Sequence, residues 1–419
     1  MFVSQKNKYN FFLVAISIIL YLSLLFGFFF DENLNFGSIQ DWDRTNRPVI
    51  DGFFQDFKHT FFNYDDFKHR HSPIYLIFLS FIKSLGISFD LIRLFNLHIS
   101  IILIYSFYKC LTIKFEKVDT NLLGILSVVI FLSPTFRSLS IWPDSRIIGL
   151  TFFVISIYQI LKFQQKNKEI NFWKSLFLLV ASAYISPNFS IFALYHLFIL
   201  WDKKKNNTLI YTLIFLIVLS TPALFYIFVL DINFITSNAP AEAAGATALS
   251  FNFANKILII GSIILFHLIP FLINKDFLSK LYKFTQKNFF LILIFLIINV
   301  FFFNYNLNFT GGGAFFQISN IFFKNNLIFF PICFLSFILI GFFIKNNLNN
   351  FIIFFILIIS NIQNTIYHKY YDPLIMILFF TILNNSLAME FFKEKKNLFF
   401  VYSFYIFYIA IRLVKNHLI

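Results

Sequence analysis

The chain has 419 residues, of which 58% are hydrophobic and only 13% are charged. Soluble domains carry about twice that charged fraction, so the composition excludes a soluble globular protein and indicates an integral membrane protein. The formal net charge of +14 does not indicate nucleic-acid binding, because the basic residues mostly border apolar runs, as the positive-inside rule describes.

The first apolar run, Phe11–Phe30, follows Lys6 and Lys8 and is long enough to span a membrane. No small-residue cleavage site follows it, so we predict a retained first helix whose N-terminus is cytoplasmic. A polar, acid-rich stretch, 31–72, comes next. The following apolar run, Ile74–Leu85, has about 12 residues, which is too short for a comfortable span, and we expect it to lie in the interface.

Later apolar runs predict further membrane helices, for a total of about 13. They lie near residues 91–111, 120–134, 146–162, 172–186, 188–201, 208–230, 254–274, 288–305, 326–344, 350–362, 373–389 and 397–414. The sequence therefore predicts an all-α polytopic membrane protein that forms a single membrane domain, 1–419. Within it we expect a long first external loop with interfacial helices, 31–90, then a further set of helices, 91–230, and variable C-terminal helices, 231–419.

Alternate loops differ in kind. One set is rich in lysine and is predicted to be cytoplasmic: Lys114–Lys117, Lys162–Lys168, Lys203–Lys205, Lys275–Lys287 and Lys393–Lys396. The other set carries groups suited to chemistry and is predicted to be external: Asp41-Trp42-Asp43, Arg70-His71-Ser72-Pro73, Trp142-Pro143-Asp144-Ser145-Arg146, Gly311-Gly312-Gly313 and His368-Lys369-Tyr370-Tyr371-Asp372. A stretch rich in alanine, Ala239–Ala248, is also expected outside. This segregation predicts that the protein works at one face of the membrane.

The first external loop carries the clearest catalytic candidates. Asp41 and Asp43 flank a tryptophan close to the end of a helix. A carboxylate there can accept a proton from an attacking hydroxyl, and general-base help of this kind contributes roughly 10²–10⁴ in rate. We predict that one of the two aspartates is the base, and the sequence does not decide which.

Cations follow in Lys68-His69-Arg70-His71, directly before the short apolar run. Cations above an apolar surface suit a lipid-linked phosphate, to which arginine offers paired donors. Ordinary headgroup anchoring is the alternative for Lys68. A metal site formed by His69 and His71 with Asp65 and Asp66 is a further alternative, although the spacing matches no strong template.

The stretch from Asp41 to Tyr108 resembles the start of the GT-C glycosyltransferases, the superfamily of the protein O-mannosyltransferases and aminoarabinose transferases. The resemblance is carried by His71-Ser72-Pro73-Ile74-Tyr75, by Leu85-Gly86, by Leu91-Ile92-Arg93-Leu94, and by Ser133-Pro134 with Trp142–Arg146. It covers roughly residues 37–162. It implies a GT-C-like fold whose catalytic module continues over 91–230, an acidic base in the first external loop, and a lipid-linked sugar donor.

The second and later external loops supply further candidates. Asp144 is a candidate second acidic site for an acceptor or a divalent cation, or else it pairs with Arg146 or Arg137. The resemblance implies donor-phosphate binding by Arg70, His71, Arg146, His368, Lys369 and Tyr371; the alternative for the late loop is an interfacial belt of aromatic and cationic residues. The glycine triplet has the flexibility of a substrate lid and lacks the Gly-Lys-Ser/Thr of a Walker loop.

The predicted function is inverting transfer of a sugar from a polyprenyl-phosphate donor to a lipid, glycan or protein acceptor, with membrane lipid as a further partner and no nucleic acid. The only candidate cofactor is a divalent cation, and the metal is unknown. The composition favours AT-rich codons and hence a bacterial cell membrane, with the active site external. The alternatives are a lipid-linked polysaccharide polymerase or ligase, and a lipid or solute transporter. A transporter should place charges inside its helices.

Overall fold

The computed structural model describes residues 2–35, 37–69, 72–232, 249–305 and 311–418. These residues form helices joined by short turns. The described part contains no β-strand, only an isolated β-bridge between Leu249 and Gln363. The chain divides into two compact units. Unit 1 comprises Met1–Pro240 and Tyr402–Ile419, and unit 2 comprises Ala241–Val401.

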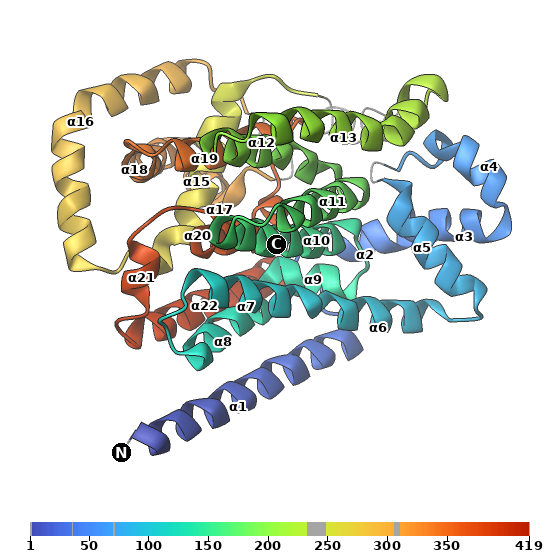
Figure 1. The fold of residues 1–419 in the computed structure, drawn as a ribbon, viewed down its shortest axis with the longest axis horizontal. Coiled ribbons are helices and arrows are strands. Elements are labelled where there is room, and N and C mark those ends of the chain that lie inside the picture. Colours follow the sequence, from blue (N-terminus) through green and yellow to red (C-terminus); the bar gives the residue numbers. More distant parts are fainter. Residues whose placement is uncertain (1, 36, 70–71, 233–248, 306–310, 419) are drawn as a thin grey trace. The chain divides into compact units, whose positions relative to one another are not determined.

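Unit 1 begins with the long apolar helix α1 (Phe2–Phe29) and continues with short helices over the first loop (Figure 1). These are α2 (Ser38–Asp41), a π-helical turn (Trp42–Asn46), α3 (Arg47–Gln55), α4 (Phe57–Phe62), a 3-10 turn (Tyr64–Phe67) and α5 (Pro73–Ser84). The run of helix from 38 to 55 is continuous, and α5 packs on α3. The short apolar run predicted after residue 73 is therefore a 12-residue helix, as expected.

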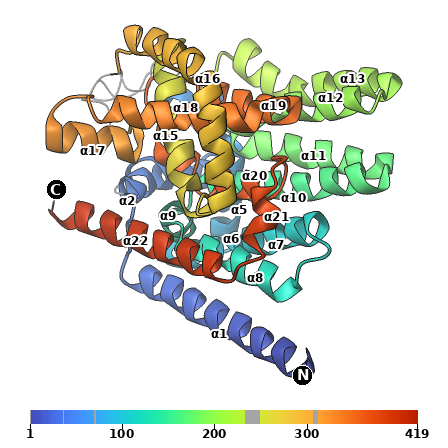
Figure 2. The same ribbon diagram turned by 90° about the vertical axis from the view of Figure 1, so that its left-hand side faces the viewer.

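The rest of unit 1 is a set of packed apolar helices. They are α6 (Phe89–Ser100), α7 (Ile102–Lys114), α8 (Thr120–Val128), α9 (Pro134–Ile141), α10 (Ser145–Lys166), α11 (Glu169–Ile185), α12 (Ala193–Asp202) and α13 (Asn206–Leu224). Helices α10 and α11 lie side by side (Figure 1). The last helix, α22 (Lys396–Leu418), returns to unit 1 from Tyr402 onward, and Figure 2 shows it with α1 along the lower edge. Hydrogen bonds from Tyr402 to the carbonyl of Ile125 and from Arg412 to the carbonyl of Leu34 hold it there.

Unit 2 is built around α15 (Phe253–Leu268), a largely buried helix. The other helices are α16 (Lys275–Phe301), α17 (Gly313–Phe323), α18 (Phe329–Ile344), α19 (Leu348–Ile359), α20 (Leu374–Phe380), α21 (Leu387–Phe391) and the start of α22, with a 3-10 turn at His368–Tyr370. Helices α16, α17, α18, α19 and α20 all contact α15. Unit 2 is therefore organised around one buried apolar helix.

Seven helices among the described residues are long and apolar enough to cross a membrane, or eight if a helix pair bent by 65° at Ser133 is one span. The prediction of about thirteen is not confirmed. Helix α19 has 12 residues and α12 has 10, and 12 helical residues reach about 18 Å, well short of a hydrocarbon core of about 30 Å.

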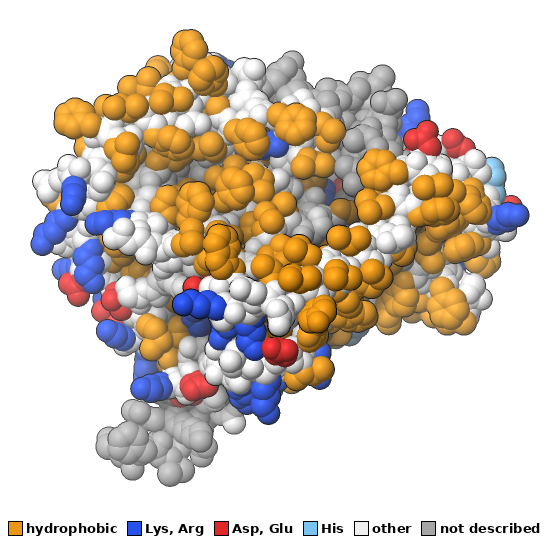
Figure 3. All heavy atoms as spheres, turned by 45° about the horizontal axis from the view of Figure 1, so that its top comes forward, with side chains coloured by type: hydrophobic (Ala, Val, Ile, Leu, Met, Phe, Trp, Pro, Cys, Tyr) orange, Lys and Arg blue, Asp and Glu red, His pale blue; other side chains and the backbone are white. Residues whose placement is uncertain are grey.

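Side chains at the surface fit a lipid environment. Phe290 on α16 is 77% exposed and Phe301 is 81% exposed, and Figure 3 shows broad areas of hydrophobic side chains on the molecular surface. The chain is therefore an all-α polytopic membrane protein, as its composition predicts.

Candidate functional site

The predicted catalytic aspartates lie on the helical run that begins with α2. Asp43 is exposed, and its carboxylate accepts a hydrogen bond from Arg47 one turn later, at 3.0 Å. Asp41 is partly buried. Two residues two positions apart on a helix point to nearly opposite sides, so these carboxylates do not converge on one substrate.

Trp42, between them, is buried in the protein. Its side chain is 1% exposed and packs edge-to-face against Phe89 at the start of α6. The tryptophan therefore fixes the rotation of the helical run that carries both aspartates.

A chain of buried hydrogen bonds joins the first loop to the Trp142–Arg146 loop. Asn46 donates from Nδ2 to the carbonyl of Pro143, at 2.8 Å. His69 Nε2 lies 2.7 Å from Asn46 Oδ1, and His69 Nδ1 lies 2.8 Å from the hydroxyl of Tyr64. Because the carbonyl can only accept, the orientation of the Asn46 amide is set, and its Oδ1 must accept from His69.

The tautomer of His69 follows from this network. Its Nε2 carries the proton, so in the neutral ring Nδ1 accepts from the Tyr64 hydroxyl. Burial raises the pKa of Tyr64 well above its ordinary value, with a smaller contribution from Tyr226, so the phenol stays protonated and able to donate. Both ring nitrogens of His69 are thereby engaged with protein groups, which leaves His69 a structural residue in this arrangement and not a metal ligand.

The Trp142–Arg146 loop ends at the N-terminus of α10. Asp144 caps this helix, since its Oδ1 accepts from the backbone N–H of Arg146 at 2.8 Å. The side chains of Asp144 and Arg146 are almost fully buried, at 3% and 7% exposed. Tyr75 on α5 lies near enough that the Asp144 carboxylate, together with burial as the larger cause, raises the pKa of its phenol. Its hydroxyl donates to Asn96.

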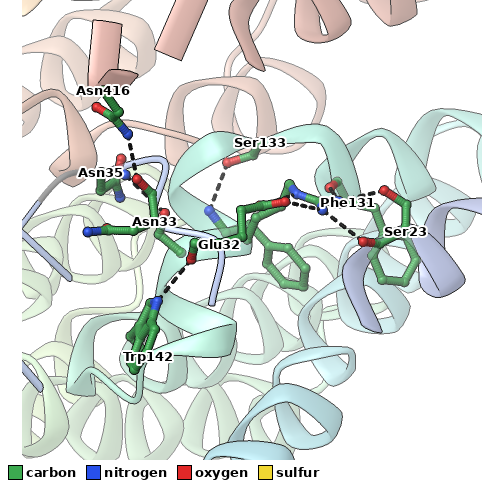
Figure 4. Close-up of polar contacts among 11 residues, drawn as sticks. Ser23, Glu32, Asn33, Asn35, Phe131, Ser133, Trp142 and Asn416 are labelled. Carbon is green, nitrogen blue, oxygen red and sulfur yellow. Dashed lines mark hydrogen bonds and ion pairs between the residues drawn. The ribbon is translucent and has the colours of Figure 1, made fainter. Parts of the chain in front are cut away.

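Arg137, one predicted partner of Asp144, pairs with Glu32. Its Nε and Nη2 donate to the two carboxylate oxygens of Glu32, both at 2.6 Å. The same guanidinium also donates to the carbonyl of Ser23 at 2.9 Å. Figure 4 shows this cluster, with Trp142 donating from its indole nitrogen to the carbonyl of Glu32. The buried ion pair thus holds the segment after α1 against Arg137 on α9.

Arg93, at the start of the first long helix after the loop, makes the neighbouring contacts. It donates to Asp31 at 2.7 Å, and its guanidinium lies 3.6 Å from the centre of the Trp142 ring. Asp31 is 62% exposed in its side chain, whereas Arg93 is 10% exposed. Asp31 therefore stands at the surface while its arginine partner anchors the Trp142 loop.

In unit 2 the structure brings two of the predicted external loops together. The backbone N–H of Gly312 donates to the carbonyl of Ile366 at 2.9 Å, and Ile366 N donates to the hydroxyl of Tyr305 at 3.1 Å. The glycine triplet has positive φ throughout. A Cβ on Gly311 would lie 2.8 Å from the Ile366 carbonyl oxygen, so this close approach requires glycine. The triplet therefore packs closely against Ile366, in the segment that leads to His368.

His368 reaches α15 beside Phe266. Its Nε2 lies 2.7 Å from Nε2 of His267, which is fully buried, and the Phe266 ring packs edge-to-face against both imidazoles. Tyr371 is 1% exposed, and its hydroxyl donates to the carbonyl of Leu357 at 3.3 Å. Lys369 is partly buried, with its ammonium 5.4 Å from the centre of the Tyr367 ring. In this loop His368 and Tyr371 are thus engaged with His267 and Leu357, and Lys369 lies partly buried beside Tyr367.

Arg70 and His71 lie outside the described residues, as does Ala239–Ala248. No group of three or more histidine, cysteine or acidic side chains that could hold a metal ion occurs in the part of the chain that the structure describes. Two other histidines have polar partners within the protein: His196 contacts Ser175 at 2.8 Å and His98 contacts Tyr21 at 2.9 Å.

Comparison of the chain with protein-family models, curated proteins and solved structures gives no match. The resemblance to the GT-C superfamily therefore stands on the sequence motifs alone.

The sequence analysis missed three charged residues. Asp31 and Glu32 are adjacent acids just after the end of α1, and two acids at the end of a long apolar run are a signal that could have identified them. Lys256 falls inside an apolar run and is 4% exposed in the structure. A lysine within such a run is itself a signal, because it is costly to bury.

Proposed function

We propose that the chain is an integral membrane glycosyltransferase that moves a sugar from a polyprenyl-phosphate donor to an acceptor hydroxyl at the external membrane face. The observation that carries the proposal is the junction of the first loop with the Trp142–Arg146 loop. These segments are about 100 residues apart, and two hydrogen bonds join them, a buried one from Asn46 to Pro143 and a partly buried one from Trp142 to Glu32. Both belong to the stretch on which the GT-C resemblance rests.

The reaction requires one carboxylate with an oxygen available to the acceptor. Glu32 is excluded from this role in the described arrangement, since both of its oxygens bind Arg137. Asp41 and Asp43 remain the proposed bases, and Asp31 joins them because it is exposed at the end of α1. The base takes the hydroxyl proton, the hydroxyl oxygen forms a bond to the anomeric carbon from the opposite side, and the bond from that carbon to the phosphate oxygen breaks. The polyprenyl phosphate leaves with the electron pair of that bond and so gains one further negative charge, which cations stabilise.

Arg146 is the phosphate ligand that unit 1 offers, together with the predicted Arg70 and His71. Its guanidinium is nearly buried at the start of α10, where the N-terminal end of the helix dipole also favours an anion. Lys369 is the corresponding candidate in unit 2. The predicted roles of His368 and Tyr371 have less support, since their polar atoms face His267 and a backbone carbonyl.

The proposed orientation rests on the lysine-rich loops, which the positive-inside rule assigns to the cytoplasm. A lipid-linked donor explains how sugar transfer proceeds on the external side, where nucleotide sugars are absent. A bacterial cell membrane is the proposed location, with undecaprenyl phosphate as carrier.

The test is transfer of radiolabelled sugar from synthetic polyprenyl-phosphate donors by purified protein in liposomes. Wild type is compared with Asp31→Asn, Asp41→Asn, Asp43→Asn and Asp144→Asn, and with Glu394→Gln as a matched control for an exposed carboxylate on a lysine-rich loop. We expect one aspartate variant to lose at least 100-fold in transfer while it still binds donor. No transfer by wild type across a donor and acceptor panel, or equal transfer by all five variants, would direct attention to the polymerase and transporter alternatives.

A further inference from the structure

Lys256 is a buried cation inside a membrane helix. It stands in the first turn of α15, within the apolar span Phe253–Phe271, and its side chain is 4% exposed. Its ammonium lies 5.7 Å from the centre of the Phe253 ring. Phe253 is the first residue of the helix, so the lysine points back toward the helix N-terminus, as long side chains on helices do.

The described contacts do not compensate for the burial of this charge. Among the residues that the structure describes, Lys256 forms no ion pair, and the span contains no acidic residue. A cation–π contact contributes about 0.5–1 kcal/mol at an exposed site and about 2 kcal/mol when desolvated. Burying an unpaired ammonium costs several kcal/mol. An anion that is not part of the described chain would balance the charge.

The surrounding groups favour an anion at this position. Asn252 caps α15 by accepting from the backbone N–H of Asn255 at 3.1 Å, which fixes the first turn. Asn255 and Asn304 exchange two further hydrogen bonds, Asn255 Nδ2 to Asn304 Oδ1 at 2.9 Å and Asn304 N to Asn255 Oδ1 at 3.0 Å. Backbone N–H groups in a first helical turn carry a partial positive charge, which adds to that of the lysine. Helix terminus and ammonium therefore act on the same small region.

We propose that the first turn of α15 binds the phosphate of a lipid phosphate monoester, with Lys256 as its cationic ligand. The site lies in the first turn of a helix that is long and apolar enough to cross a membrane, so we expect it at the depth of lipid headgroups. Phe251 and Phe253 beside it are 79% and 49% exposed, which provides apolar surface for the lipid chain next to the phosphate site. The inference does not depend on sugar transfer, because it concerns binding alone.

The test measures thermal unfolding of the full chain in phosphatidylcholine nanodiscs with added polyprenyl phosphate. Binding to the folded state raises the melting temperature as the ligand concentration exceeds its Kd. We expect Lys256→Met to bind at least tenfold more weakly than wild type, and Lys256→Arg to keep most of the affinity, because a guanidinium also binds phosphate. Lys345→Met is the matched control, since Lys345 also lies 5.7 Å from a phenylalanine ring but is exposed.

Equal stabilisation of wild type and Lys256→Met would overturn the proposal. Equal stabilisation of wild type by inorganic phosphate at the same concentration would overturn the requirement for a lipid. Glu242 lies outside the described residues and is an alternative counter-ion for Lys256. The variant Glu242→Gln tests this alternative. If Glu242→Gln and Lys256→Met lower the melting temperature equally in the absence of added lipid, the proposal is also overturned. If Lys256→Met does not fold, wild type is crosslinked with a photoactivatable polyprenyl phosphate instead. Failure to find any crosslink within residues 251–260 would refute the site.

Discussion

The ion pair between Arg137 and Glu32 is expected to be the most important single polar contact of unit 1. Its side chains are 4% and 17% exposed. The guanidinium donates to both oxygens of Glu32, twice to Ser23 and once to the carbonyl of Phe131. Removing one partner of a buried ion pair costs roughly 3–5 kcal/mol, because the other charge stays buried without compensation. Arg137→Met should therefore lower the free energy of unfolding by about 3–4 kcal/mol.

The matched control is the pair formed by Arg47 and Asp43, whose side chains are 44% and 46% exposed. Exposed pairs contribute about 0–1 kcal/mol, so Arg47→Met should have a small effect. Unfolding is measured by denaturant titration in detergent micelles, following tryptophan fluorescence. The double variant Glu32→Met/Arg137→Met should be less destabilised than the sum of the single variants, since it leaves no lone charge. Equal costs for Arg137→Met and Arg47→Met, or additive costs in the double variant, would refute this reasoning.

Three further predictions concern the loops. Asn46→Leu should cost about 1–3 kcal/mol in stability, because it leaves the Pro143 carbonyl and His69 Nε2 without their amide partner; an unchanged unfolding midpoint would contradict the assigned network. Gly311→Ala should be more destabilising than Gly86→Ala. Both glycines have positive φ, but only at Gly311 would the new Cβ meet a carbonyl oxygen. Similar unfolding midpoints for the two variants would argue against the close approach. Burial raises the pKa of Tyr305 to about 12 from an ordinary value of 10.0. Stability contributed by its neutral phenol is present below pH 10 and is lost as the pH rises toward 12, so Tyr305→Phe should weaken the alkaline loss of stability seen in pH-dependent unfolding, and an unaltered profile would count against it.

The sequence determined the fold class and several local features. Low charge and long apolar runs can only be satisfied by helices in a membrane, and the runs predicted from Phe11 and from Ile74 are helical in the structure over about the predicted lengths. Asp144 was predicted as an acidic site or as a partner of an arginine; the cap that it forms in the structure nevertheless obeys a local rule, since aspartate before a helical run commonly accepts a hydrogen bond from its first turn. Such features depend on neighbours in the chain and on the solvent.

The number of spans was less accessible to sequence analysis. Apolar composition does not distinguish a helix that crosses the bilayer from a shorter one that is buried against other helices. Helices α18 and α19 are the clearest examples: they are strongly apolar, yet they have only 16 and 12 residues and pack against α15. Helix ends are set by turns and by packing, which periodicity does not reveal.

Only the tertiary structure decided which charged residues are partners. The sequence suggested Arg137 as a partner of Asp144, but Arg137 pairs with Glu32, which is 105 positions away. It likewise gave no sign that His368 meets His267 or that the glycine triplet clasps Ile366. Asp41 and Asp43 look equivalent in the sequence, yet one is partly buried and the other is exposed beside Arg47. Composition and local pattern fix what a segment can become, whereas the partner of a buried charge depends on which distant segments pack against it, because every such charge must find compensation wherever the folded chain brings it.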